Sequence, residues 1–426
     1  MENLPILLLL MMVAALLVTR ARMVTVCPLA ALVILFALGF EAPEVIAKAA
    51  PSIATVFVVM TTTQLAIRSI LQGGAGERVT VGVAKLAAHR WLRRVPASVL
   101  LPMVFIPATM LFAMIAHNIP AILMLTPLAL TLSARYGVRP AVTLSAMLIA
   151  SNLGGASMAW GDTPAIIQRE QWGFSPALFA SAMLPRNLAI LTLLTSVACL
   201  VTWFPTRHVK TDWLNTLSRL KARDYVINNS RFTQVDRREF FLGIAALVIF
   251  ITAQFAFPKH SLVVGAAVLA GQILLMPDDR RLTAYTTLGL EAIIVICSLF
   301  VIAAAVETTP LVQDLSAHLK ANQANGAIEI TAYLLTTGIS ADGAAATLAP
   351  LVHNLSGGSM LSAWQLACGI CAGSSTLLIA ASAGPILNSV SRDSGNELTF
   401  RQYMRFGLPF SLLMMAFYLF FNMLAR

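Results

Sequence analysis

Long apolar stretches alternate with short charged segments along the whole chain. A membrane-spanning helix needs about 20 consecutive apolar residues, and the uncharged stretches at 95–134 and 343–391 are longer than this. The pattern predicts two successive series of apolar elements. They cover residues 4–18, 24–40, 51–67, 95–134, 140–171 and 176–204, and then 240–257, 261–276, 285–306, 327–354, 361–390 and 406–424. The sequence therefore predicts an all-α polytopic membrane protein with about 10 spans and two helical hairpins.

Composition supports this fold class and excludes several functions. Of the 426 residues, 58% are hydrophobic and 11% are charged, whereas a soluble chain carries charge on about a quarter of its residues. The net charge of +10 comes from lysines and arginines between the apolar stretches, so it indicates membrane topology rather than nucleic-acid binding. The chain has no phosphate-binding loop and no zinc-protease motif, and its five cysteines suggest no disulfide framework. We expect a protein that is not an enzyme and needs no cofactor or metal.

The most polar segment, residues 206–239, divides the chain into two halves. It contains basic residues in excess of acidic ones and is predicted to be a cytoplasmic linker. Residues 1–205 then form a first repeat and residues 240–426 a second. All basic segments can face the cytoplasm, as the positive-inside rule requires, only if residues 95–134 enter and leave the membrane on the same side as a re-entrant hairpin. The halves then have opposite orientations, which is the inverted-repeat arrangement of secondary transporters.

Each half contains a hairpin followed by a stretch that should not form a continuous helix. The first hairpin, 95–134, turns near His117 and Asn118, and the second, 327–354, turns near Ser340. Within 140–171, glycines weaken the helix and Pro164 suits the first turn of a new one. The stretch 361–390 repeats this device. Interrupted helices at corresponding positions of two halves point to a substrate site near the middle of the membrane.

Two isolated carboxylates lie in these uncharged stretches. Asp162 is the only charged residue between Arg139 and Arg169, and Asp342 is the only one between Glu329 and Arg392. A carboxylate in the membrane must be protonated, paired with a cation or hydrated, so both are candidates for ion binding. The alternatives are that Asp162 caps a helix and that Asp342 lies in a turn near the far surface. His117 is a candidate for proton coupling together with Asp162, the alternative being a histidine that is only hydrogen-bonded.

These motifs resemble the ion transporter superfamily, which includes the arsenite permeases (ArsB), the NhaD sodium/proton antiporters and the dicarboxylate symporters. The family pattern SNxGGxxTxxGDPPN is similar to residues 151–165, and GGSxxxIGSAAG is similar to 373–384. The hairpin tips at 117–127 and 340–350 have the family's spacing to proline. The small second tip is also similar to the MamN-like proteins of magnetosome membranes. Thr163 replaces a family proline, and Ser340 with Ala341 replaces a polar tip, so substrate coordination should differ from the family pattern.

The residues and the resemblance together predict the site. Neutral oxygen and amide ligands combine with carboxylates and with glycines that let the backbone approach an ion. The predicted ion-binding residues are Asn118, Asn152, Gly154, Gly155, Ser157, Asp162, Thr163, Ser340, Asp342, Ser374, Ser375 and Ser382.

The predicted function is secondary active ion transport by alternating access, with a proton-linked cation antiporter of the Na⁺/H⁺ type first. An arsenite-like oxyanion permease, a dicarboxylate permease and a non-transporting membrane scaffold are the alternatives. The expected partners are an inorganic ion, a proton and the lipid bilayer, with no nucleic acid, and a homodimer is left open. The resemblance implies a multi-pass protein of a prokaryotic inner membrane, and the MamN-like similarity would place it in a magnetosome membrane, where it would serve biomineralization.

Overall fold

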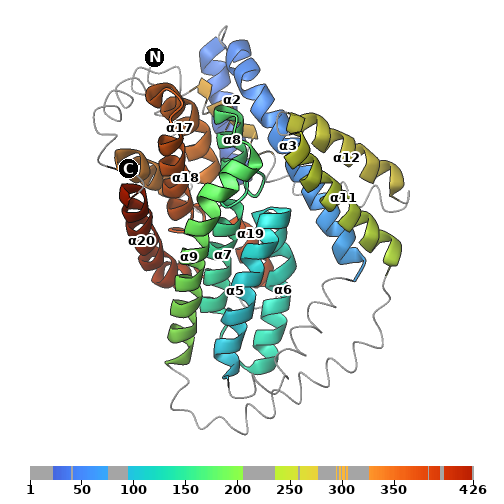
Figure 1. Ribbon diagram of the computed structural model, residues 1–426, viewed down its shortest axis with the longest axis vertical. Coiled ribbons are helices and arrows are strands. Elements are labelled where there is room, and N and C mark those ends of the chain that lie inside the picture. Colours follow the sequence, from blue (N-terminus) through green and yellow to red (C-terminus); the bar gives the residue numbers. More distant parts are fainter. Residues whose placement is uncertain are drawn as a thin grey trace.

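The computed structural model describes residues 23–39, 42–74, 95–204, 236–257, 260–276, 294, 297–298, 300–302, 304–305, 326–381, 383–393 and 398–424. Within these ranges every regular element is a helix and no strand occurs (Figure 1). The predicted apolar stretch 4–18, nearly all of the predicted linker, most of the stretch 285–306 and Ser382 lie outside the described residues.

The helices follow the predicted apolar elements closely. They are α2 (Met23–Leu38), α3 (Ala42–Gln72), α5 (Ala97–Ala116), α6 (Asn118–Tyr136), α7 (Ala141–Gly155), α8 (Thr163–Trp172), α9 (Pro176–Trp203), α11 (Arg237–Ala256), α12 (Ser261–Leu275), α16 (Ala327–Ile339), α17 (Ala341–Ser356), α18 (Met360–Ser374), α19 (Ala383–Asp393) and α20 (Phe400–Leu424). α11 begins at Arg237, three residues before the predicted apolar stretch 240–257, because Asp236 caps it by accepting a hydrogen bond from the Glu239 backbone N–H at 3.3 Å.

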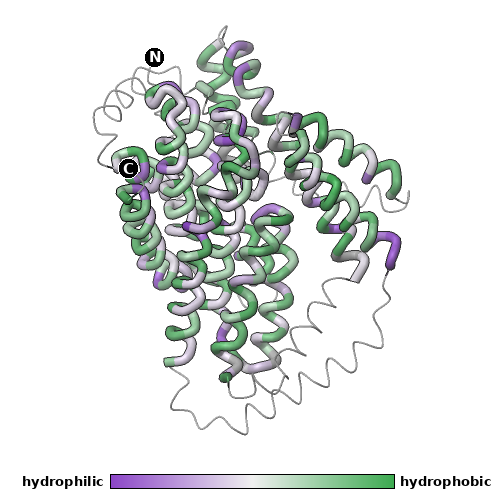
Figure 2. Tube along the Cα trace, viewed as in Figure 1, coloured by the Kyte–Doolittle hydropathy of each residue, from purple (hydrophilic) through white to green (hydrophobic). Residues whose placement is uncertain are grey.

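Helix lengths agree with a protein that crosses a membrane several times. Among the described residues, 5 helices are long and apolar enough to do so: Ile53–Ile70 within α3, Ser98–Ala116 in α5, α9, α11 and α20. Large apolar side chains are exposed, including Phe36, Val263 and Leu274. Figure 2 shows that hydrophobic residues predominate along most of the helices. An exposed apolar exterior is unfavourable in water and favourable in lipid.

Two series of helices pack in the same pattern. α5 contacts α6, α7 and α9, and α16 contacts α17, α18 and α20 in the corresponding order. The series also exchange contacts, because α6 packs against α19 of the second series while α17 packs against α8 of the first. A separate group, in which α3 packs against both α11 and α12, lies on one side of this core (Figure 1). The two interrupted stretches are therefore enclosed by helices of both halves.

Glycines allow the interrupted stretches to approach their hairpins closely. A Cβ atom at Gly154 of α7 would overlap the backbone carbonyl of Met110 in α5, and a Cβ at Gly369 of α18 would overlap that of Glu329 in α16. The same close approach thus occurs in both halves. Because a backbone carbonyl cannot rotate away as a flexible side chain can, these positions require glycine.

We expect Gly154→Ala to destabilise the protein by about 1–3 kcal/mol, because α5 and α7 must move apart. Thermal unfolding of the purified protein in detergent measures this. Gly271→Ala in α12 is the control, since a Cβ there would meet no atom within 4 Å. Equal melting temperatures for the two variants would contradict the close-packing argument.

Candidate functional site

Each predicted hairpin is a pair of helices joined at a single residue. His117 connects α5 to α6 with φ 81° and ψ 152°, and Ser340 connects α16 to α17 with φ 97° and ψ 161°. These are the two non-glycine residues with positive φ among those described. Such conformations cost about 1–3 kcal/mol and persist only where the surroundings impose them.

Backbone hydrogen bonds attach each tip to the break in its own half. The Asn118 N–H donates to the Gly161 carbonyl at 3.1 Å, and the Ala341 N–H donates to the Ala380 carbonyl at 2.8 Å. In both cases the first helical residue after the tip bonds to the loop between two half-helices. The strained tips are held by this interaction.

The helices break where the glycines and prolines predicted. α7 ends at Gly155, residues 156–162 form a compact loop, and α8 starts at Thr163. Gly155 and Gly161 approach so closely that a Cβ at Gly161 would lie 2.9 Å from the Gly155 Cα. In the second half α18 ends at Ser374, and α19 starts at Ala383. The interrupted stretches predicted at 140–171 and 361–390 are therefore present.

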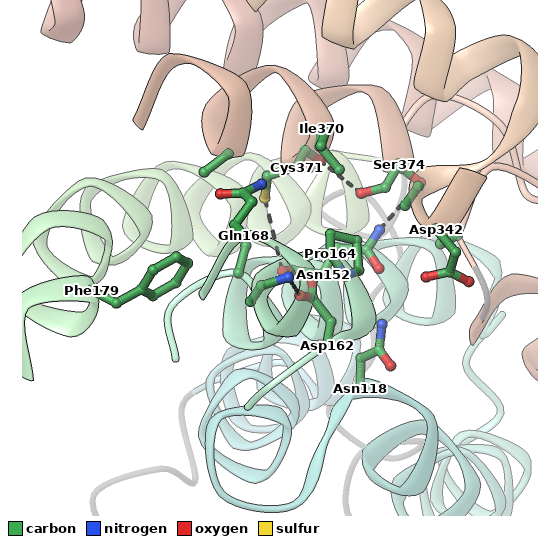
Figure 3. A pocket seen from close by; sticks show the side chains of 15 residues that line it. Asn118, Asn152, Asp162, Pro164, Gln168, Phe179, Asp342, Ile370, Cys371 and Ser374 are labelled. Atoms are coloured by element: carbon green, nitrogen blue, oxygen red, sulfur yellow. Dashed lines mark hydrogen bonds between the residues drawn. The ribbon is translucent and has the colours of Figure 1, made fainter. Parts of the chain in front are cut away.

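Side chains from both halves gather around one cavity where the breaks and the tips meet (Figure 3). Its volume is about 10 Å³, which is room for about one water molecule. Its polar lining consists of Asn118, Asn152, Asp162, Gln168, Asp342, Cys371 and Ser374. Asn152 Nδ2 joins the two breaks by donating to the Ser374 carbonyl at 3.2 Å and to Ser375 Oγ at 3.3 Å.

Asp162 has two structural roles at once. Its Oδ1 accepts a hydrogen bond from the Ala165 N–H at 2.9 Å, so it caps α8, as the alternative interpretation proposed. Its side chain is 7% exposed and also lines the cavity. The capping role and a position in the candidate site are therefore compatible.

Asp342 is buried rather than placed at the far surface. It lies in the first turn of α17, is 4% exposed and lines the same cavity as Asp162. Its carboxylate lies beside the Thr163 hydroxyl and interacts electrostatically with Asp162. Among the described residues, Asp342 Oδ1 has no hydrogen-bond partner. The idea that Asp342 is a surface turn residue is wrong, because the tip folds inward against the break.

The described lining of the cavity includes two carboxylates and no lysine or arginine. Two buried negative charges of this kind are unfavourable unless a cation or a proton compensates them. Neutral oxygens lie near them, since Asn118 Oδ1, Gln168 Oε1 and Thr163 Oγ1 are buried without hydrogen-bond partners among the described residues. This arrangement suits a small hard cation or a proton.

Several predicted site residues lie near the cavity without lining it. Ser340 caps α17, since its Oγ accepts from the Gly343 N–H at 3.4 Å, and Ser157 Oγ donates to the Leu153 carbonyl at 2.6 Å. Ser375 bonds to Asn152 and to the Cys371 carbonyl. Gly154 and Gly155 serve packing.

His117 is 1% exposed and does not line the cavity. Its ring interacts with the neighbouring Asn118 side chain, although neither ring nitrogen reaches hydrogen-bond geometry within the described part of the chain. The interpretation as a merely hydrogen-bonded histidine therefore stays open. Proton coupling by this residue stays a prediction.

Sequence reasoning missed two polar residues of the cavity. Gln168 lies one helical turn after Pro164 on α8, and both line the cavity. The i, i+4 spacing puts Gln168 on the same face of α8 as Pro164, which is the one sequence signal for it. Cys371 was not among the predicted site residues, but it lines the cavity, and its thiol donates to the Asn152 carbonyl at 3.8 Å and accepts from the Tyr418 hydroxyl at 3.5 Å.

We expect Ser340→Val to be less stable than Ser340→Gly by about 1–3 kcal/mol, because valine tolerates positive φ poorly. Thermal unfolding of the two purified variants measures the difference. Ser359, whose φ is −54° and whose side chain makes no capping hydrogen bond, provides the matched pair. Glycine at position 340 that is no better tolerated than valine would contradict the strain at the tip.

Comparison with known proteins gives one family match. The family model described as citrate transporter (CitMHS) matches residues 1–369. This range includes both hairpins, the first break and most of α18. It therefore covers most of the residues that line the cavity.

Individual relatives share low sequence identity with this chain. An uncharacterized transporter of Mycobacterium tuberculosis is 26% identical over 354 residues, covering 79% of this chain and 78% of that protein. A 46 kDa membrane protein of Mycobacterium leprae is 23% identical over 387 residues, covering 85% and 84%. The magnetosome protein MamN of Magnetospirillum gryphiswaldense is 26% identical over 331 residues, covering 69% and 71%. The similarity to MamN is thus present at low identity, and these matches do not specify the arsenite-permease or NhaD type.

Proposed function

Because the chain belongs to the citrate transporter family, we propose that it is a secondary active transporter with a cation site in the cavity between its halves. The family is described as citrate transporters and the Mycobacterium tuberculosis relative is named a transporter, so the chain is a transporter rather than an enzyme. One observation carries the proposal about the site. Asp162 and Asp342, one from each half, line the same cavity, and its described lining holds no basic residue.

The chemistry of the lining favours a cation or a proton over an anion. An anion would meet two like charges at short range, which costs free energy that the half-charges of helix ends offset only in part. Carboxylate, amide and hydroxyl oxygens are the ligands that small hard cations prefer. The volume of about 10 Å³ has room for a bare ion, or for a proton on one of the two aspartates. It is too small for an organic acid as substrate.

The proposed mode of transport is alternating access by two inverted halves. The matching order and packing of α5 to α9 and α16 to α20 support this. So do the equivalent tip-to-break hydrogen bonds at Asn118 and Ala341. A site built from both halves changes its access when the halves change their relative positions.

Two kinds of coupling follow from this site. The first is proton-linked cation antiport, in which the cation and the proton compete for the Asp162 and Asp342 carboxylates. The second is cation-dependent uptake of citrate or another carboxylate, which the family match favours. Here the cation would neutralise the cavity and help to hold an anionic substrate next to it.

Flux measurements in proteoliposomes separate these modes. Antiport dissipates an imposed pH gradient when Na⁺ or another cation is added, and it needs no citrate. Carboxylate uptake gives accumulation of radiolabelled citrate that depends on the cation. No flux of either kind under any imposed gradient would overturn the proposal and favour a scaffold.

We expect Asp162→Asn and Asp342→Asn each to reduce cation-coupled flux by about tenfold or more, the equivalent of 1.4 kcal/mol of lost ion binding. Asparagine caps helices about as well as aspartate, so the first variant removes charge while keeping the cap of α8. The effect is measured as flux into proteoliposomes that contain equal amounts of each variant. A monodisperse elution profile of the purified variant is the check on folding.

Asp236→Asn is the matched control, because Asp236 also caps a helix but does not line the cavity. Full activity in Asp162→Asn with a normal dependence on cation concentration would mean that Asp162 only caps α8. The same result in both cavity variants would remove the cation site from the proposal.

A further inference from the structure

A groove outside the candidate site lies between α9, α18 and α20. Its volume is about 600 Å³, and its walls are mainly apolar, formed by Pro185, Leu361, Phe421 and Leu424 with Trp364. Arg186 is the one charged residue of its described lining. Figure 1 shows α20 on the side of the bundle opposite α11 and α12, and α9 packs against it.

Arg186 is not paired with a carboxylate in the described part of the chain. Its Nη1 donates to the Ala182 carbonyl of the same helix at 2.9 Å, and its buried Nε has no hydrogen-bond partner there. The side chain therefore extends along α9 toward the helix N-terminus. A guanidinium group in apolar surroundings gains most from an anion with two oxygens in its plane, such as a phosphate.

The groove lies at the level where neighbouring helices end. Leu361 and Trp364 belong to the first turns of α18, and Phe421 and Leu424 belong to the last turn of α20. Helices that cross a membrane end near its interface, where tryptophan side chains and the heads of long basic side chains also gather. We therefore infer that this end of the groove lies near the lipid headgroups.

We propose that this groove binds an anionic phospholipid, with the phosphate on Arg186 and an acyl chain along the apolar wall. Charge complementarity selects the headgroup, because the described lining offers a cation and no carboxylate. The flank of α20 continues the apolar wall outward, with Phe420 59% exposed and Met423 68% exposed. A lipid acyl chain fits such a surface without any change in the protein.

The groove is also connected to the candidate site through aromatic contacts. Trp364 stacks on Phe174 with ring centroids 4.7 Å apart and contacts Phe179 edge-on at 5.7 Å. Phe179 lines the cavity that holds Asp162. A bound lipid therefore touches a side chain that packs directly on the wall of the cavity.

Native mass spectrometry of the full-length protein, released from mixed micelles of phosphatidylglycerol and phosphatidylcholine, tests the proposal. We expect bound phosphatidylglycerol to exceed bound phosphatidylcholine in the unmodified protein. Arg186→Gln should lower the affinity for phosphatidylglycerol by about tenfold, the loss of one charge-assisted contact, while Arg186→Lys keeps part of it. Arg139→Gln, at an exposed arginine outside the groove, should have no effect.

A second measurement locates the lipid without relying on transport. Phosphatidylglycerol with brominated acyl chains should quench the tryptophan fluorescence more strongly in the unmodified protein than in Trp364→Phe, because other tryptophans such as Trp203 are also exposed. The part of the quenching that depends on Trp364 should weaken in Arg186→Gln. Equal retention of both lipids, or equal quenching in Arg186→Gln and the unmodified protein, would overturn the proposal. A dimer that loses its partner in Arg186→Gln and carries no lipid would assign the groove to a second copy of the chain and equally overturn it.

Discussion

The structure depends on one constraint, that backbone groups freed by a helix break inside a membrane must find partners within the protein. An unpaired N–H or C=O group in apolar surroundings costs several kcal/mol. The tips use the simplest solution, since each donates its first free N–H to the carbonyl of the neighbouring break. Side chains complete the pairing, with Asn187 donating to the Leu153 carbonyl at 3.0 Å and Tyr403 donating to the Ser375 carbonyl at 2.8 Å.

This constraint also determines where a site can form. Polar residues have to be concentrated around the breaks to satisfy the backbone, so the same region holds the polar atoms that remain unsatisfied. Asn118 shows both functions in one residue, because its N–H pairs with Gly161 while its Oδ1 faces the cavity without a partner among the described residues. The glycines that permit close packing around the breaks keep the cavity small, since any side chain at Gly154 would push α7 away from α5.

The sequence predicted the breaks well because they are local events. Glycine and proline act on the backbone of their own helix, so 140–171 and 361–390 could be identified without knowledge of the neighbouring helices. The two lone carboxylates were found because their isolation in uncharged stretches is also visible in the local sequence.

The uses of the serines were not predictable, because Ser157 and Ser340 could bind an ion or pair with backbone groups equally well on composition alone. Only the packing of α9 and the geometry of the tip decide between these uses. Gln168 was missed because its role depends on which face of α8 meets α17.

On the proposed function, the two carboxylates explain how ion binding could act on the whole molecule. Asp162 belongs to a half-helix of the first half and Asp342 to a hairpin of the second, and α8 packs against α17 where they meet. With both carboxylates ionised and no cation present, their repulsion opposes this packing. A bound cation or proton removes the repulsion and favours the closed arrangement. Ligand binding then shifts the equilibrium between arrangements of the halves by as much as the ligand binds one of them more tightly than the other. A carboxylate in only one half would bind an ion without this effect, so the division of the pair between the halves is the feature that links binding to movement.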